Sequence, residues 1–166
     1  MTHLEYTDLI NGYGIVFDAK PDAVPYNYRI SYKVSQICLI LDKSCWGKSG
    51  CSPVKLHMIS FALSSKAIME RLIAFTQSES APPPIVRFDP AVNRAVSFAI
   101  ADRLIFQASN GKYLLTDKGK NLVSEIEKDS KILTVEKQEL KALSKKLSDE
   151  KIKHLTEVWR SIYAEN

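Results

Sequence analysis

"FDPAVNRAVSFAIADRLIFQASNGKYLLTDKGKNLVSEI", residues 88–126, is the stretch that decides the fold of this chain. It opens with Asp89 and Pro90. An aspartate side chain caps the free N–H groups of a helix N-terminus, and proline suits the first helical position. The apolar residues that follow recur at helical spacing; they are Val92, Val96, Ala99 and Ile100, with Leu104 near the end. The opening therefore predicts a helix from Pro90 to Arg103.

The periodicity of the same stretch changes after this helix. Residues 104–108 predict a strand, residues 109–112 a tight turn in which Gly111 takes a positive φ, and residues 113–115 the returning strand. Thr116 then caps a further helix, whose apolar residues are Leu122, Val123 and Ile126. Helix, two-strand hairpin and capped helix follow one another in the order of a winged helix.

This segment resembles the winged helix-turn-helix superfamily. The residues that carry the resemblance are Asp102-Arg103-Leu104-Ile105, Asn110-Gly111-Lys112-Tyr113 and Leu115-Thr116-Asp117-Lys118-Gly119. The resemblance implies a fold and is nearly silent on function. We therefore expect a mainly α protein with a small β-hairpin wing. Its winged helix-turn-helix core would occupy residues 85–130, with flanking helices and an N-terminal arm.

The remaining sequence predicts helices on both sides of this core. Residues 1–27 show no sustained helical period and predict the arm. Residues 28–84 predict a helical hairpin, with a first helix from Tyr28 to Lys43 and a second from Pro53 to Thr76. Residues 131–166 predict two C-terminal helices. The first carries Leu140, Leu143 and Leu147, and the second, capped by Ser148, carries Ile152, Leu155, Trp159 and Ile162.

The stretch "CWGKSGC", Cys45–Cys51, contains the Gly-Lys-Ser end of a phosphate-binding loop. A complete loop has a further glycine five residues before Gly47, where this chain has Asp42, and it follows a strand. Here a predicted helix precedes it, which favours a polar turn. Cys45, Cys51 and His57 lack a fourth ligand and a Cys-x-x-Cys pair, so they do not predict a zinc site. We expect no cofactor and no metal.

The overall charge does not point to nucleic acid. The net charge is +4, and residues 86–128 carry 7 Lys and Arg against 5 Asp and Glu, so no segment is a concentrated basic patch. Three cysteines without a framework pattern fit a reducing compartment. With no basic-then-apolar leader and no run of about 18 apolar residues, we expect a cytoplasmic protein without a membrane segment.

Candidate contact residues divide into two groups. If the predicted helix at residues 90–103 read DNA, the residues in contact would be Asn93 and Arg94, with Lys112 at the tip of the wing. This weakly charged set favours a winged helix that binds protein instead. Candidate partner-binding residues are Trp46, Leu155 and Trp159. The tryptophans are equally compatible with core positions, and Leu155 and Trp159 face either a partner or the chain's own core. No catalytic constellation is evident.

A second resemblance covers more of the chain. The arm, "PYNYRISYKVSQICLIL" as first helix, "SPVKLHMISFAL" as second, and a winged helix with a helical tail are similar to the middle component of bacterial ABC-three-component systems. The small subunits of Lamassu anti-phage systems represent this family. Tyr28-Arg29-Ile30 and Val54-Lys55-Leu56-His57 are the strongest local matches.

This resemblance implies a non-enzymatic adaptor that joins an SMC-like ABC ATPase to an effector subunit, such as a nuclease or another toxic enzyme. The role is comparable to that of a kleisin, and DNA would be contacted indirectly, through the complex. The alternative is a winged-helix transcriptional regulator that binds DNA. A third possibility is a nucleotide-binding enzyme that uses Lys48.

Overall fold

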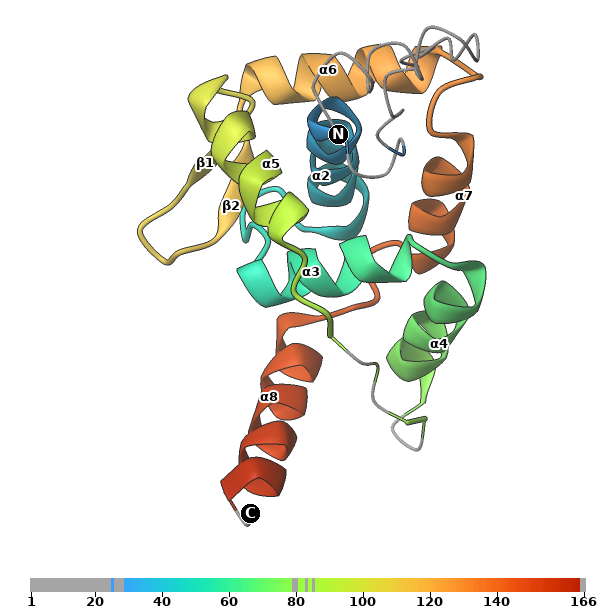
Figure 1. Cartoon of the computed structure of the whole chain (residues 1–166), viewed down its shortest axis with the longest axis vertical. Helices are drawn as coiled ribbons and strands as arrows, with labels where there is room; N and C mark the ends of the chain where they lie inside the picture. The colour runs from blue at the N-terminus through green and yellow to red at the C-terminus, as the bar shows by residue number, and fades with distance from the viewer. Residues whose placement is uncertain (1–24, 26–28, 79–80, 83, 85, 165–166) are drawn as a thin grey trace, which may run out of the picture.

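The computed structural model describes residue 25, residues 29–78, residues 81, 82 and 84, and residues 86–164. This part of the chain is mainly helical and contains one small antiparallel hairpin, as the sequence predicts. Its elements are α2 (Ile30–Ser44), α3 (Pro53–Ala62), α4 (Lys66–Gln77), α5 (Pro90–Ala101), β1 (Ile105–Gln107), β2 (Tyr113–Leu115), α6 (Asp117–Lys128), α7 (Thr134–Leu143) and α8 (Asp149–Ala164) (Figure 1).

Helix α2 is the centre of the molecule. It packs against α3, α5, α6, α7 and β2, and Figure 1 shows these four helices around it, with α4 and α8 beyond α3. The five consecutive residues 37–41 are each at most 4% exposed. A helix that is covered on nearly all sides must be apolar nearly all round, which explains the sequence Ile-Cys-Leu-Ile-Leu at this point.

Helix α5 begins as the sequence predicts and ends two residues earlier. The Asp89 carboxylate accepts a hydrogen bond from the Ala91 N–H at 2.8 Å, and Pro90 takes the first helical position. At the other end Arg103 adopts a left-handed φ of 56°, and the Leu104 N–H donates to the Ala99 carbonyl at 2.8 Å. This closing motif turns the chain sharply into β1.

The hairpin forms where it is predicted, with the second strand as expected and the first one residue shorter at each end. β1 and β2 pair antiparallel, with Phe106 opposite Leu114, and Gly111 takes a φ of 78° in the turn. Thr116 caps α6, because its hydroxyl accepts from the Gly119 N–H at 3.1 Å. A contact that the sequence does not reveal adds to this sheet: Cys51 forms an isolated bridge to Tyr113 on β2.

The predicted helix from Pro53 to Thr76 is wrong, because α3 and α4 are separate helices. Helix α3 ends at Ala62, and the Ser64 hydroxyl donates to the Phe61 carbonyl at 2.7 Å. Serine side chains that bond to nearby backbone groups compete with helical hydrogen bonds. The pair Ser64-Ser65 is therefore the local signal for the break, and residues 28–84 do not form a simple helical hairpin.

The C-terminal region forms the two predicted helices. Ser148 caps α8 by accepting from the Lys151 N–H at 3.2 Å, and α8 packs against α3. Leu147, expected on the preceding helix, lies in the link after it and is fully buried. The predicted arm lies outside the described residues except for Pro25. Among the helices that are described, none is long and apolar enough to cross a membrane.

Candidate functional site

If α5 read DNA, its outward face would make the contacts. Arg94, Ser97, Phe98 and Ala101 share this face, because residues three and four apart lie on one side of a helix. The opposite side of α5 is buried through Val92, Ala95, Val96 and Ala99. Phe98 is 54% exposed. The face therefore presents a large aromatic side chain at its middle.

Two of the three candidate nucleic-acid contacts are bonded to the chain itself. The Asn93 side-chain oxygen lies 2.9 Å from His57 Nε2, and the Lys112 ammonium forms an ion pair with the Asp149 carboxylate at the start of α8. Within the described residues, Arg94 makes no side-chain hydrogen bond or ion pair. Lys112 is thus directed towards α8, away from the role of a wing-tip cation.

His57 on α3 is hydrogen-bonded to the start of α5 through both of its ring nitrogens. Its Nδ1 accepts from the Asp89 N–H at 3.3 Å, so its Nε2 carries the proton and donates to the Asn93 oxygen. The ring also packs against Phe88, with centroids 4.8 Å apart. Both ring nitrogens are occupied, and the side chain is buried.

Cys45 and Cys51 lie close enough for one thiol to hydrogen-bond the other. This bond lowers the pKa of Cys45, and together with burial it raises the pKa of Cys51. Both side chains are at most 2% exposed. Over the described part of the chain, no group of three or more His, Cys, Asp or Glu residues is placed to hold a metal ion.

The Gly47-Lys48-Ser49 segment forms a turn directly after α2. The N–H groups of Ser49 and Gly50 both donate to the Trp46 carbonyl at 2.9 Å. In a phosphate-binding loop such N–H groups point at the ligand instead. The turn is thus closed on itself by its own backbone.

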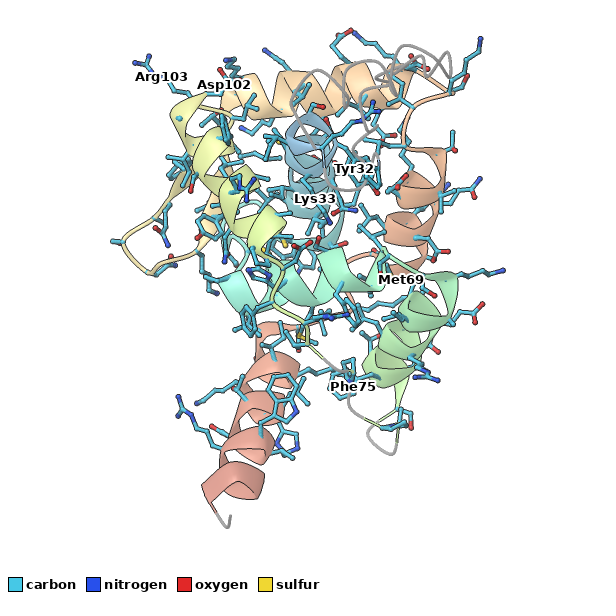
Figure 2. The ribbon with its side chains drawn as sticks, in the orientation of Figure 1. Tyr32, Lys33, Met69, Phe75, Asp102 and Arg103 are labelled. Carbon is cyan, nitrogen blue, oxygen red and sulfur yellow. The ribbon has the colours of Figure 1, made fainter. Side chains whose placement is uncertain are left out.

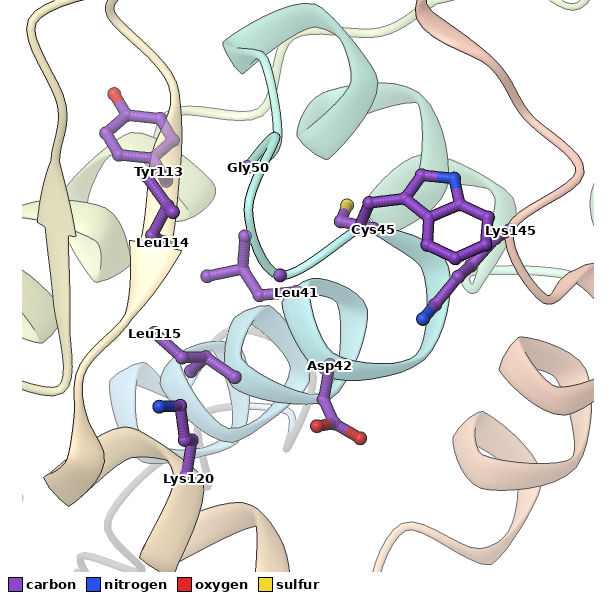
Figure 3. A pocket seen from close by; sticks show the side chains of 11 residues that line it. Leu41, Asp42, Cys45, Gly50, Tyr113, Leu114, Leu115, Lys120 and Lys145 are labelled. Carbon is purple, nitrogen blue, oxygen red and sulfur yellow. The ribbon is translucent and has the colours of Figure 1, made fainter.

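A pocket of about 210 Å³ lies beside this turn. Figure 3 shows Leu41 and Leu115 towards its middle, with Lys120 and Lys145 at opposite ends in that view. Trp46, which also lines it, is 62% exposed. Its indole ring lies under the Lys145 ammonium, 4.4 Å from the ring centroid. We call this feature the Trp46 pocket.

The other two candidate partner residues lie against the chain's own core. Leu155 is 2% exposed, and Trp159 is partly buried against the hydrophobic core. Of the two positions that the sequence allowed for Leu155, burial on its own chain is the one observed, so it is not an accessible partner contact. The structure brings neither residue to the Trp46 pocket.

A buried polar network, which the sequence patterns above do not predict, lies at the start of α2. Tyr32 and Lys33 lie beside each other there (Figure 2). The Lys33 ammonium lies 3.4 Å from the Gln36 side-chain oxygen, 3.4 Å from the Ser60 hydroxyl and 3.5 Å from the Asp89 carboxylate. Polar residues inside the apolar helices at positions 33, 36 and 60 were the available signal.

The same network extends to α7. Gln36 donates to the Tyr32 hydroxyl at 3.2 Å, and Tyr32 donates to the Glu136 carboxylate at 2.6 Å. The Ser60 hydroxyl donates to the Gln36 oxygen at 2.8 Å. An amide oxygen does not take up the serine proton, so Ser60 is not activated as a nucleophile. The network joins α2, α3 and α7, and Tyr32, Lys33, Gln36 and Ser60 line a pocket of about 480 Å³.

Comparisons with protein-family models, with curated proteins and with solved structures found no match to this chain. The two resemblances drawn from the sequence therefore stay predictions.

Proposed function

We propose that this chain is a non-catalytic adaptor subunit of an anti-phage defence complex, in which a winged-helix fold binds proteins. The observation that carries the proposal is the outward face of α5. Phe98 is 54% exposed there, while Asn93 and Lys112 are engaged by His57 and Asp149. This face is better suited to an apolar protein surface than to a phosphate backbone.

The order of the elements supports the winged-helix assignment. A winged helix consists of a helix, a short first strand, two further helices and a hairpin, in that order. The corresponding parts of this chain are α2, Cys51, α3, α5 and β1–β2. Cys51 pairs with β2 on the side opposite β1, where the first strand of a winged helix lies. Helix α4 is then an insertion. On this assignment the fold spans about residues 30–115, a wider segment than the one predicted from the sequence.

The energetics of the two kinds of partner differ. DNA binding draws most of its affinity from cations that neutralise phosphates. On the outward face of α5 the one cation is Arg94. Protein interfaces instead draw much of their affinity from a few aromatic and arginine side chains near the centre of the patch. Phe98 with Arg94 one turn before it is such a pair.

The resemblance to ABC-three-component middle components supplies the partners. In this proposal the chain joins an SMC-like ABC ATPase to an effector, and those two subunits carry out ATP hydrolysis and the toxic chemistry. The adaptor contributes binding surfaces alone. Ser60 bonded to an amide and His57 held at both nitrogens agree with such a role.

Co-expression of the tagged chain with its neighbouring gene products, followed by nuclease treatment and size-exclusion chromatography, tests the proposal. We expect a nuclease-resistant complex that contains the ATPase. Phe98→Ala should weaken the complex about tenfold or more, whereas Ser97→Ala on the same face should leave it intact. A chain that always elutes alone would overturn the adaptor function.

A DNA-binding regulator is the second candidate, and two arginines favour it. Arg94 lies on the outward face of α5, and Arg103 extends outward beyond its end (Figure 2). If the chain is a regulator, it should bind DNA from upstream of its own operon, with affinity that falls steeply as salt rises. Arg94→Glu should abolish that binding, whereas Phe98→Ala should affect it little.

A further inference from the structure

The Trp46 pocket is a fixed feature of the fold, since the turn that carries Trp46 is held against β2. Cys51 and Tyr113 exchange two backbone hydrogen bonds of 2.9 Å. Gly50 has a φ of 71°, and a Cβ at this position would lie 2.9 Å from the Tyr113 carbonyl oxygen. The backbone of the turn therefore lies in direct contact with β2. This contact fixes the position of the turn from which the exposed Trp46 side chain projects.

The pocket is too small for a cofactor. Its volume is about 210 Å³, whereas sites for drug-sized ligands usually measure about 300–1,000 Å³. Its walls include the apolar residues Leu41, Leu114 and Leu115 besides Trp46. A space of this size and lining suits one apolar side chain. Exposed tryptophans beside such pockets are frequent anchors of protein interfaces.

The charges around the pocket favour an acidic partner. Lys43 is shared between Asp42 at the rim, at 3.2 Å, and Glu127, at 3.5 Å, and Lys120 is paired with Asp117 at 2.9 Å. Lys145 lies over the Trp46 ring, and among the described residues it forms no ion pair. Lys48, on the turn itself, has no ion pair in that part of the chain either. The side chains near the pocket that have no ion-pair partner among the described residues, Lys145 and Lys48, are therefore both positively charged.

We propose that the Trp46 pocket binds a segment of a partner protein that inserts one apolar side chain, Leu, Met or Phe, between flanking carboxylates. The apolar side chain packs on Trp46 and Leu41, and the carboxylates approach Lys145 and Lys48. The inference rests on the proposed adaptor function and supplies it with a docking site separate from Phe98. Charge complementarity distinguishes this occupant from a basic segment or a neutral one.

NMR titration of the 166-residue chain tests the proposal directly, because it has only two indole N–H groups to follow, those of Trp46 and Trp159. The probe is a capped peptide, Asp-Glu-Leu-Glu-Asp. The controls are the same peptide with Ala at its centre, and one with Leu between lysines. We expect the Leu-centred acidic peptide alone to shift the Trp46 signal, while the Trp159 signal stays in place. Lys145→Glu should weaken this binding about fivefold to tenfold.

Three results would overturn the proposal. One is no shift of the Trp46 signal, and another is equal shifts with the Ala-centred or lysine-flanked peptide. The third is a shift with protein concentration alone, which would identify a second copy of the chain as the occupant.

The co-expressed complex separates this inference from the adaptor function itself. A complex that forms with wild type and survives Trp46→Ala combined with Lys145→Glu would overturn the pocket proposal and leave the adaptor function standing. Loss of the complex in this double variant, with its circular dichroism spectrum unchanged, supports the pocket. Should the wild-type chain form no complex, the adaptor function fails, and the peptide titration still decides whether the pocket takes an acidic segment.

Discussion

Gly119, in the first turn of α6, occupies a place where no side chain fits. A Cβ on this residue would lie 2.1 Å from the Leu104 carbonyl oxygen and 2.9 Å from a methyl group of Leu115. Both contacts are far inside van der Waals distance, and the first is to backbone. The glycine therefore allows α6 to begin directly against the end of α5 and the hairpin.

We expect Gly119→Ala to lower the free energy of unfolding by about 2–3 kcal/mol, because the helix start must move away from Leu104. Gly47→Ala is the matched control, since a Cβ on Gly47 would have no atom within 4 Å. It should change stability by less than about 1 kcal/mol. Urea denaturation of the two variants checks this, and equal effects would contradict the close contact.

Cys38, fully buried in α2, makes stability depend on alkaline pH. Burial raises the pKa of its thiol to about 12, from a usual value near 9. The unfolded chain therefore ionises this thiol above about pH 9, while the folded chain keeps it protonated. The stabilising contribution is fully present below pH 9 and is lost as the pH rises from 9 towards 12.

Between pH 9 and 10.5 the wild-type chain should therefore lose roughly 1 kcal/mol per pH unit more than Cys38→Val. Urea denaturation at a series of pH values measures the difference. Parallel curves for the two proteins would show that Cys38 ionises equally in both states.

At the scale of the elements, helix caps were the features most reliably predicted from the sequence. Asp89, Thr116 and Ser148 each cap the predicted helix. A cap depends on three or four consecutive residues, so the local sequence is sufficient to define it. The bridge from Cys51 to Tyr113 and the network around Lys33 depend on contacts distant in the sequence. Local patterns carry no information on such contacts.

Two serines at helix starts allow the contribution of a cap to be measured. The Ser52 hydroxyl accepts from the Lys55 N–H at 3.3 Å, whereas Ser65, at the start of α4, makes no capping hydrogen bond. Ser52→Ala should cost about 1 kcal/mol of stability. Ser65→Ala, the same chemical change, should cost less than about half of that. Thermal and urea denaturation report both values, and a larger loss for Ser65 would contradict the assigned caps.

On the scale of the whole molecule, amphipathic patterns predicted which helix faces are apolar, but not whether the same chain or a second protein buries them. Trp46 and Leu155 were both candidate partner contacts, and the structure exposes the first and buries the second. An apolar stripe has the same appearance whether its cover is another helix of the chain or a second protein. Phe98 gives no signal in the sequence, because one aromatic residue in a helix of small residues forms no apolar stripe.

The attachment of α8 yields a prediction for the whole molecule. Leu155 is 2% exposed, and its neighbour His154 is exposed on the same helix. Leu155→Ala should cost about 2–4 kcal/mol, because it leaves a cavity under α8, while His154→Ala should stay within about 0.5 kcal/mol. Hydrogen exchange measures where the loss acts: amides of α8 should exchange faster by local opening, while those of α2, at the centre, open only with the whole chain and should remain the better protected of the two. Unchanged exchange in α8 would mean that Leu155 does not hold this helix to the core, and that the C-terminal helix is available to a partner after all.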